Sequence, residues 1–188
     1  MCAAIKSALP GFPVFLRWSP IDLVPGGNEI EDALELAPYI DRAGFGYINV
    51  QIGWHESSVP TTTKEIPDGY WSWVSAELKK VCTRTPVVTG YRETDPDVME
   101  KILAEGKADM IGGLRYSLAD PEFPKKLRER REKEIRKCIC CCRCLDDMAA
   151  GKGQEYCSVN PGLGPELLAK LEPAKKPRRV MVIGSSDL

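Results

Sequence analysis

Four cysteines of this chain have the spacing of ligands for an iron–sulfur cluster. Cys138, Cys141 and Cys144 follow one another at three-residue intervals, and Cys157 stands alone further along the chain. Thiolates at such intervals wrap a loop around one cluster, and a remote cysteine supplies the fourth ligand. Structural zinc sites more often have two separate C-x2-C pairs, whereas this chain has one compact group. The spacing therefore favours an iron–sulfur cluster over zinc, and either metal site over free thiols or disulfides.

The remaining cysteines leave the choice of ligands open at two positions. Cys140 and Cys142 interleave with the predicted ligands, so C-x-C-C-x-C sets are also available. Either thiol could replace a neighbouring ligand. Cys2 and Cys82 have no partner at a meaningful spacing. We expect these two to be buried thiols.

Arginines and glycines at the ends of predicted strands suggest a phosphate site. Arg17 ends the first of these strands, Arg92 follows the third, and Gly112-Gly113-Leu114-Arg115 follows the fourth. Glycines let backbone N–H groups approach a phosphate, and a guanidinium group adds charge-assisted hydrogen bonds. These residues together favour a phosphorylated cofactor, although each arginine alone also fits an ordinary surface charge.

His55 is the only histidine of the chain and directly follows the second predicted strand, in Gly53-Trp54-His55-Glu56. Because imidazole titrates near neutral pH, His55 is a candidate proton donor to a substrate that is being reduced. A purely structural role is the alternative for a lone histidine. Glu56 either orients the ring or faces water.

The elements that must position these residues alternate between strands and helices. The apolar segments 12–18, 47–52, 86–90 and 109–112 predict strands. Helices are predicted over about 29–43, 70–81 and 95–106, the first with a capping box from Asn28 to Glu31 and a kink at Pro38. A strand–helix repeat with short connections predicts an α/β fold with parallel strands. Four such units cannot close an eight-stranded barrel.

The character of the sequence changes after the fourth strand. A charged helix is predicted over 125–137, and the cysteines follow it. Residues 161–177 are rich in proline and lysine and fit a connector, and 178–184 predicts a strand that reaches a glycine turn. A strand followed by glycine is how a dinucleotide-binding unit begins, although a simple terminal strand fits equally. Both ends of the chain read as interruptions of larger units.

Charge and hydropathy exclude several classes of protein. The formal net charge is -1, with acids and bases interleaved, so no electrostatic footprint for nucleic acid or membrane is present. No apolar run approaches the length of a membrane span. The clustering of the cysteines argues against a secreted disulfide scaffold and favours the reducing cytoplasm.

Several motifs together resemble one group of flavoenzymes. The chain is similar to the bacterial 2,4-dienoyl-CoA reductases, which are old yellow enzyme-like NADH:flavin oxidoreductases that carry an iron–sulfur cluster. The resemblance rests on Ile52-Gly53-Trp54-His55-Glu56, Thr89-Gly90-Tyr91-Arg92, Ala108-Asp109-Met110-Ile111-Gly112, Leu118-Ala119-Asp120-Pro121 and Cys157-Ser158-Val159-Asn160-Pro161. The spacing from Cys141 to Cys144 instead resembles trimethylamine dehydrogenase. The two motifs thus point to different subfamilies.

The resemblance implies a fold, cofactors and roles for residues. It implies an FMN-binding TIM barrel, then a [4Fe-4S] loop, then domains for FAD and NAD(P)H, with electrons passing from NAD(P)H to FAD, the cluster and FMN. A hydride from FMN would reduce a conjugated alkene or enoyl thioester, with His55 as the active-site histidine. The implied FMN contacts are Arg17, Arg92, Gly112, Gly113 and Arg115. The implied cluster ligands are Cys138, Cys141, Cys144 and Cys157.

By this resemblance the chain is an internal fragment of a larger oxidoreductase. The four strands correspond to strands 5–8 of the barrel, in a partial FMN-binding barrel over 1–136. The cluster loop covers 137–161, a linker 162–177 and the start of the FAD/NAD(P)H-binding domain 178–188. We expect the isolated fragment to be inactive, and to be oligomeric or dependent on the other half barrel. The alternatives are an amine dehydrogenase, or a non-catalytic module that binds a cluster or zinc together with a partner.

Overall fold

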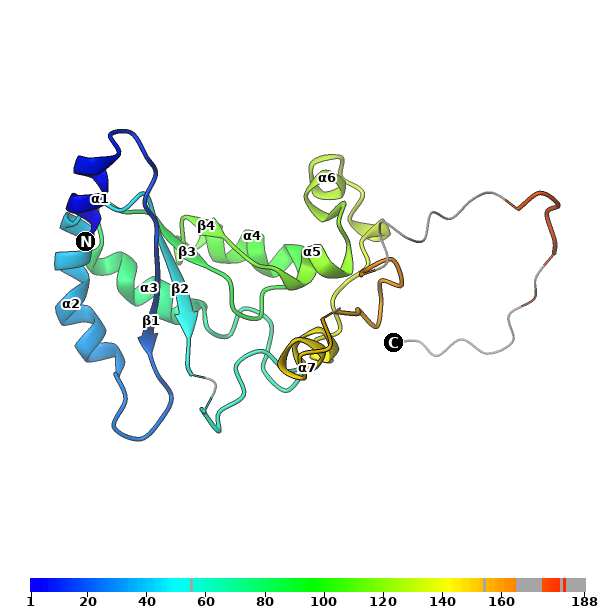
Figure 1. Cartoon of the computed structure of the whole chain (residues 1–188), viewed down its shortest axis with the longest axis horizontal. Coiled ribbons are helices and arrows are strands. Elements are labelled where there is room, and N and C mark those ends of the chain that lie inside the picture. The colour runs from blue at the N-terminus through cyan, green and yellow to red at the C-terminus, as the bar shows by residue number, and fades with distance from the viewer. Residues whose placement is uncertain (55, 154, 165–173, 180, 182–188) are drawn as a thin grey trace.

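Four parallel strands form the centre of the protein, arranged in the order in which they occur in the chain (Figure 1). The computed structural model describes residues 1–54, 56–153, 155–164, 174–179 and 181. The strands are β1 (Leu16–Ile21), β2 (Ile48–Ile52), β3 (Val87–Thr89) and β4 (Met110–Ile111). The predicted α/β fold with a parallel sheet is confirmed. That the sheet is half of a barrel stays a prediction.

Helices connect the strands and continue beyond them. They are α1 (Cys2–Ala8), α2 (Ile30–Arg42), α3 (Ser72–Val81), α4 (Pro96–Ala104), α5 (Arg115–Ala119), α6 (Phe123–Arg128) and α7 (Arg143–Ala149), with a 3-10 turn over Glu132–Glu134. Figure 1 shows α2 and α3 on the same side of the sheet, and α7 beyond its far end. The three predicted helices between strands correspond to α2, α3 and α4.

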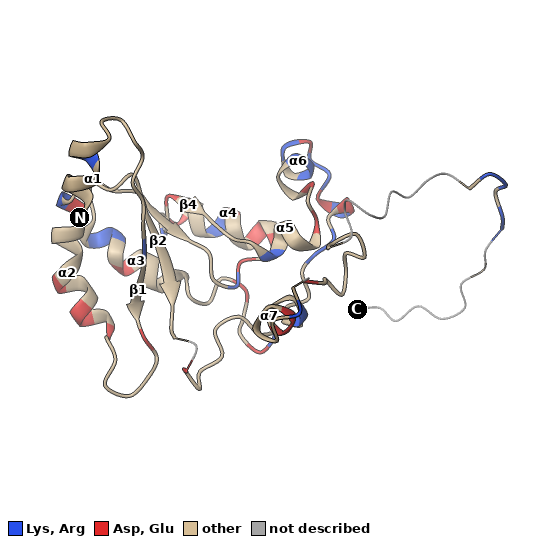
Figure 2. Cartoon of the chain, viewed as in Figure 1, with Lys and Arg blue, Asp and Glu red and all other residues tan. Residues whose placement is uncertain are grey.

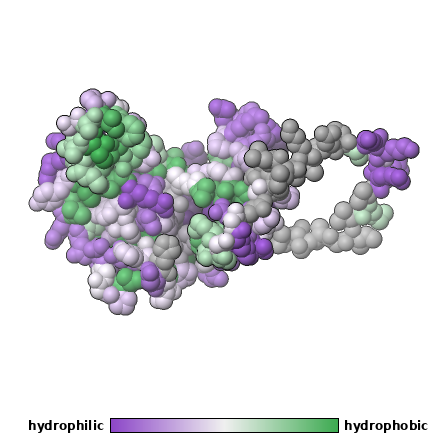
Figure 3. Space-filling model, in the orientation of Figure 1, coloured by the Kyte–Doolittle hydropathy of each residue, from purple (hydrophilic) through white to green (hydrophobic). Residues whose placement is uncertain are grey.

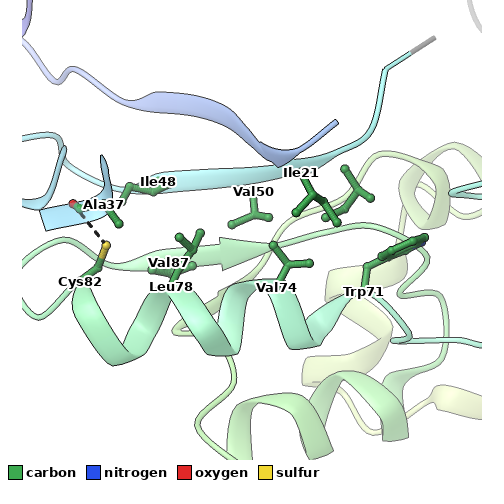
Figure 4. Packing of buried hydrophobic residues seen from close by; sticks show 10 residues of the cluster. Ile21, Ala37, Ile48, Val50, Trp71, Val74, Leu78, Cys82 and Val87 are labelled. Carbon is green, nitrogen blue, oxygen red and sulfur yellow. Dashed lines mark hydrogen bonds between the residues drawn. The ribbon is translucent and has the colours of Figure 1, made fainter. Parts of the chain in front are cut away.

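The core lies between the sheet and the helices α2 and α3. Ile48 and Val87 from the strands pack with Val74 and Leu78 of α3, and all four are fully buried. Figure 4 shows these side chains meeting across the gap between sheet and helix, and Cys82 close to Ala37 of α2. The burial of each such side chain stabilises the folded state by about 1.5–3 kcal/mol. This packing fixes the strand ends from which the candidate site is built.

The opposite face of the sheet carries polar side chains. The residues of β2 alternate between buried and half-buried, so Asn49 and Gln51 point away from the core. Arg17 of β1 pairs in register with Asn49, and its Nε donates to Gln51 Oε1 at 3.0 Å. No described helix packs its apolar side on this face, because the apolar residues of the strands face α2 and α3. This open, polar face is therefore available to other groups.

The start of α2 differs from the prediction by one residue. Its capping box consists of Glu29 and Asp32, and not of Asn28 and Glu31. Asn28 is instead held by Asp22, whose Oδ2 accepts from its backbone N at 2.8 Å and from its side chain at 2.8 Å. Pro38 lies inside α2, which continues through it to Arg42. The burial of Ala33 and Ala37 against the core outweighs the local cost of the proline.

Two predictions about secondary structure are wrong. The first strand begins at Leu16 and not at residue 12, so Arg17 is near its start and does not end it. The predicted charged helix over 125–137 is broken into α6 and the 3-10 turn, because Arg130 adopts a left-handed conformation with φ of 55°. Two contacts from Lys126 hold this break, one to Asp120 Oδ2 at 2.6 Å and one to the carbonyl of Glu134 at 3.0 Å.

The structure tests the linker and the strand predicted near the C-terminus only in part. Most of the linker predicted over 162–177 and most of the strand predicted over 178–184 lie outside the described residues. Within the described segment 174–179 no strand is present.

The surface of the described chain has mixed charge. Figure 2 shows acidic and basic residues both distributed along the chain. Figure 3 shows apolar side chains gathered over α1 and the turn after it, where Leu9 and Phe12 are more than half exposed at 53% and 56%. None of the described helices combines the length and the apolar character needed to cross a membrane.

Candidate functional site

The cysteine loop, which we define as residues 138–144, has an irregular backbone with two left-handed residues. Cys140 and Cys142 have φ angles of 54° and 59°. Such angles are costly for residues with a Cβ and persist only where the surroundings impose them. The two left-handed turns reverse the chain on both sides of Cys141. They leave Cys141 exposed and bury Cys140.

The cysteine loop encloses a cavity of about 20 Å³. All four predicted cluster ligands line it, together with the two alternative thiols. The full lining is Arg115, Leu118, Cys138, Ile139, Cys140, Cys141, Cys142, Arg143, Cys144, Cys157, Ser158 and Val159. Residues remote in sequence, from α5 to Ser158, thus meet around the thiols.

Short contacts distinguish the thiols from one another. Cys138 Sγ accepts a hydrogen bond from the backbone N of Cys140 at 3.4 Å, as ligand sulfurs often do. Cys141 Sγ lies 3.3 Å from Ser158 Oγ, next to the remote Cys157. In contrast, the thiol of Cys142 donates back to the carbonyl of Cys140 at 3.7 Å. The thiol of Cys142 therefore has a hydrogen-bond partner within the cysteine loop.

The thiols around the cavity are the residue type that holds an iron–sulfur cluster or a zinc ion. In an iron–sulfur cube each of four cysteines binds a different iron atom. Zinc instead binds its four ligands at one centre. The four predicted cluster ligands all line this one cavity.

Basic residues near the loop favour the ionised form of the thiols. The hydrogen bond from Cys138, followed by Arg92 and Arg115, lowers the pKa of the Cys140 thiol to about 7 against the effect of burial. The same hydrogen bond and burial raise the pKa of Cys138, while Arg115 opposes the rise. Burial also raises the pKa of Cys144, again opposed by Arg115. The thiol with the lowered pKa is therefore Cys140, which is not a predicted ligand, whereas the thiol pKa values of the predicted ligands Cys138 and Cys144 are raised.

Arg115 stands at the start of α5, directly after β4, and reaches the cysteine loop. Its Nη1 donates to the carbonyl of Thr62 at 2.7 Å and its Nη2 to Thr62 Oγ1 at 2.8 Å. The same Nη1 lies 3.9 Å from Cys142 Sγ. The guanidinium group therefore joins the segment after β2 to the cysteine loop.

Arg92 is held in a second network below the loop. Its backbone is left-handed, with φ of 67°, and its Nη1 pairs with Asp68 Oδ2 at 2.8 Å. Its Nε donates to the carbonyl of Thr63 at 3.2 Å. Asp68 also accepts from the backbone and hydroxyl of Thr94. The guanidinium group of Arg92 is thus engaged by protein atoms.

The predicted phosphate contacts do not converge as a set. Arg17 contacts Gln51 on the open face of the sheet. A Cβ at Gly112 would meet Val88 Cγ1 at 2.8 Å, and one at Gly113 would meet the Tyr116 ring at 2.6 Å. Close packing of protein atoms therefore already accounts for both glycines. As FMN contacts these residues stay a prediction, with Arg17 the one whose guanidinium projects onto the open face.

The predicted proton donor, His55, lies outside the described residues. Its neighbours are placed: Trp54 donates from its indole N–H to Asp22 Oδ1 at 2.6 Å, and Glu56 is exposed. Asp22 follows β1 and is 6% exposed. It therefore anchors the segment that leads into His55. Asp22 directly follows β1 but lies four residues beyond the predicted strand 12–18, so the sequence pattern did not identify it.

Glu93 is a second residue that the sequence analysis missed. It follows β3 and is 4% exposed, with Oε1 accepting from Thr89 Oγ1 at 3.0 Å. Its Oε2 has no hydrogen-bond partner among the described residues. Burial raises the pKa of Glu93 to about 8, partly offset by the Thr89 hydrogen bond. No sequence signal separates this carboxyl group from the many exposed ones.

The parallel strand–helix units, with a thiol-lined cavity beyond one end of the sheet, place the chain among the α/β proteins. Within that class, the chain belongs to the NADH:flavin oxidoreductase / NADH oxidase family, whose profile matches residues 3–134. The resemblance read from the motifs is confirmed at the level of this family.

Three known proteins illustrate the range of relatives. A metal reductase of Desulforamulus reducens is 35% identical over 97% of this chain and 27% of its own length. The structure of a 2-naphthoyl-CoA reductase in complex with 2-naphthoyl-CoA has a TM-score of 0.85 at 31% identity, covering 93% of this chain and 27% of that one. Histamine dehydrogenase from Rhizobium sp. 4-9 has a TM-score of 0.76 at 29% identity, covering 88% and 24%. The chain therefore spans about a quarter of the length of these relatives.

Proposed function

We propose that this chain is the cluster-bearing part of a flavin-dependent oxidoreductase. Its [4Fe-4S] ligands are Cys138, Cys141, Cys144 and Cys157. One observation carries the proposal: these four thiols, whose sequence spacing is typical of cluster ligands, line a single cavity. A [4Fe-4S] cluster is a cofactor that four cysteine thiolates hold.

The residues of this chain have distinct tasks in that proposal. The four thiolates hold the cluster, which supplies one-electron transfer between flavin centres. Cys140 and Cys142 shape the loop through their left-handed backbones. Arg92 and Arg115 supply positive potential, and Ile139 and Val159 limit the access of water to the cavity.

The flavin part of the proposal rests on the family. The family implies flavin binding, and we assign FMN to the open face of the sheet, where Arg17 and Gln51 project. Arg92, Gly112, Gly113 and Arg115 remain proposed FMN contacts. FAD and NAD(P)H are proposed for further parts of the whole protein. In this proposal the sheet is strands 5–8 of a TIM barrel, completed by strands outside this chain.

For the whole protein we propose NAD(P)H-dependent reduction of a conjugated alkene or enoyl thioester. A relative whose structure holds 2-naphthoyl-CoA is the support for a thioester substrate. His55 is the proposed proton donor. Asp22 serves as a positioning residue, because it holds Trp54 directly before His55.

Amine oxidation is the second candidate, and two observations favour it. The Cys141-x2-Cys144 spacing resembles trimethylamine dehydrogenase. Histamine dehydrogenase is also among the similar solved structures. In that case the cluster would accept electrons from the flavin after oxidation of the amine, so the cysteine assignment is the same for both candidates.

Anaerobic purification of the chain tests the cluster assignment. Iron, acid-labile sulfide, zinc and flavin are counted per polypeptide, for the wild type and for single serine variants of the cysteines. We expect about four irons and four sulfides in the wild type. Serine at Cys138, Cys141, Cys144 or Cys157 should lower the iron content, whereas serine at Cys140 or Cys142 should not. Zinc in place of iron, or loss of iron from the control variants, would contradict the assignment.

A further inference from the structure

The guanidinium group of Arg115 is fixed at the wall of the cysteine cavity. Two hydrogen bonds of 2.7 and 2.8 Å to Thr62 hold both terminal nitrogens. The side chain is half-buried and lines the cavity, with Nη1 3.9 Å from Cys142 Sγ. Its position therefore does not depend on solvent or on a flexible partner.

No acid neutralises the charge of Arg115 in the part of the chain that the structure describes. Its partners are the carbonyl and hydroxyl of Thr62, which are neutral. The other arginines near the loop differ: Arg92 pairs with Asp68 at 2.8 Å, and Arg143 pairs with Asp147 at 2.9 Å. Among the described residues Arg115 thus has no acidic partner, and it lies beside the thiols.

We propose that Arg115 sets the reduction potential of the cluster held by the cysteine loop. The inference rests on the proposed function, because it requires a cluster at Cys138, Cys141, Cys144 and Cys157. Four thiolates give the bound cluster a net negative charge, and each added electron increases it. A fixed cation at the cavity wall therefore stabilises the reduced form more than the oxidised form.

The site gives this charge an unusually strong effect. Charges interact more strongly where protein replaces water, and the cavity wall is formed largely by apolar and sulfur atoms. The 3.9 Å approach to Cys142 places an N–H donor beside the sulfur atoms as well.

A redox titration of the full chain, purified anaerobically and followed by electron paramagnetic resonance, tests the proposal. At the wild-type midpoint potential, Arg115→Gln should lower the ratio of reduced to oxidised cluster about tenfold, which equals about 59 mV for one electron. Arg115→Lys keeps the charge and should restore most of the wild-type ratio of reduced to oxidised cluster. Arg143→Gln is the matched control, because Arg143 lines the same cavity but its side chain is 53% exposed, so that solvent screens its charge. This control should stay within about twofold of the wild type.

The possible outcomes separate the inference from the proposed function. A wild-type chain without iron contradicts the proposed function. Four irons in both proteins with an unchanged ratio in Arg115→Gln overturns the inference alone. Loss of flavin from Arg115→Gln at an unchanged ratio also overturns it, and assigns Arg115 to the flavin.

A second variant tests the inference if Arg115→Gln binds less iron than the wild type. Arg115→His makes the charge switchable within one sample, since histidine loses its proton near pH 6.5. The ratio of reduced to oxidised cluster in this variant should fall as the pH rises through that range, by more than in the wild type. A pH dependence equal to that of the wild type overturns the inference.

Discussion

Cys140 and Cys142 show how a single residue type can serve two purposes in one loop. Both lie between predicted ligands, and sequence spacing alone leaves them as alternatives. Their φ angles of 54° and 59° distinguish them from Cys141, because these backbones favour glycine. The structure therefore supports a role for Cys140 and Cys142 in shaping the backbone of the loop. The predicted ligands remain Cys138, Cys141, Cys144 and Cys157.

The first prediction concerns this distinction. Cys140→Gly and Cys142→Gly should retain the full iron content and raise the free energy of unfolding by about 1 kcal/mol each, because glycine removes the left-handed strain. Iron analysis and urea unfolding of the purified chain measure the two effects. Cys141→Gly is the matched comparison, and it should lose iron. Iron loss from the glycine variant at Cys140 would identify that residue as a ligand.

The second prediction concerns the buried carboxyl group of Glu93. Its pKa of about 8 lies above the value of 4.5 expected in the unfolded chain, so the folded chain holds a proton that the unfolded chain releases. Stability should therefore be greatest below the unfolded pKa and should decline as the pH rises towards about 8. Glu93→Gln should remove this decline and add about 4 kcal/mol at pH 8.

Urea unfolding at a series of pH values measures the effect of Glu93. Glu65→Gln is the control, because it makes the same substitution at an exposed carboxyl group. Parallel stability curves for wild type and Glu93→Gln between pH 5 and pH 8 would show that Glu93 is not protonated in the folded chain.

Among the elements, α2 is joined to the sheet by a carboxylate at its C-terminal end. Asp41 is buried and accepts from the backbone N of Thr83, Arg84 and Thr85 at 3.1, 3.0 and 2.8 Å. Burial alone would raise the pKa of Asp41, but these three donors bring it below its usual value. The contact fixes the turn that leads into β3.

The third prediction follows from this turn. Asp41→Ala leaves three backbone donors without their acceptor and should lower the free energy of unfolding by about 2–4 kcal/mol. Glu35→Ala, on the exposed face of the same helix, should change it by less than about 0.5 kcal/mol. Thermal and urea unfolding measure both. Equal effects of the two substitutions would mean that the Asp41 hydrogen bonds do not stabilise the turn.

A buried ion pair similarly joins α6 to the entrance of the cysteine loop. Lys126 Nζ lies 2.6 Å from Asp120 Oδ2, and the two side chains are 11% and 1% exposed. The same carboxylate accepts from the backbone N of Arg136 at 3.0 Å. Asp120 therefore holds the chain just before Cys138.

The fourth prediction tests this attachment. Lys126→Met leaves the Asp120 charge buried without its partner and should destabilise the chain by about 3–5 kcal/mol. Limited proteolysis should then cleave between residues 128 and 138 more rapidly than in the wild type. Lys125→Met is the neighbouring control, since Lys125 pairs with Glu122 at the surface. Unchanged cleavage in Lys126→Met would show that the pair does not hold the loop.

For the molecule as a whole, the sheet has two outer edges among the described residues. β1 pairs only with β2, and β4 pairs only with β3. Leu9 and Phe12, in the segment between α1 and β1, are exposed apolar side chains. Figure 3 shows an apolar area over this part of the surface. Unpaired edges with apolar neighbours favour association.

The fifth prediction is that the purified chain associates through this region. Its apparent size in gel filtration should increase with concentration, and Phe12→Lys should reduce the increase, because a charge in an exposed apolar area opposes its burial between two chains. Tyr39→Lys is the control, since Tyr39 is also exposed, at 68%, but belongs to α2 and not to the segment after α1. An equal reduction by both variants would indicate general repulsion by charge.

Much of the fold and half of the candidate site could be predicted from the sequence. The alternation of apolar segments and amphipathic helices predicted the parallel α/β arrangement, because these patterns are local. The cysteine spacing predicted which residues gather at one cavity, since a loop this short keeps its thiols together. The break after Arg128 was missed, because it depends on Lys126 meeting Asp120 in the folded chain.

Only the tertiary structure decided what the arginines and the buried carboxyl group do. Arg115 contacts Thr62 across 53 positions of sequence, and Arg92 contacts Asp68 across 24. Such partners depend on how the loops after β2, β3 and β4 fold over one another, and no local pattern encodes that. The sequence thus specified the thiols and the elements that carry them. Folding specified which charges face those thiols, because burial and long-range contacts exist only once the loops are packed together.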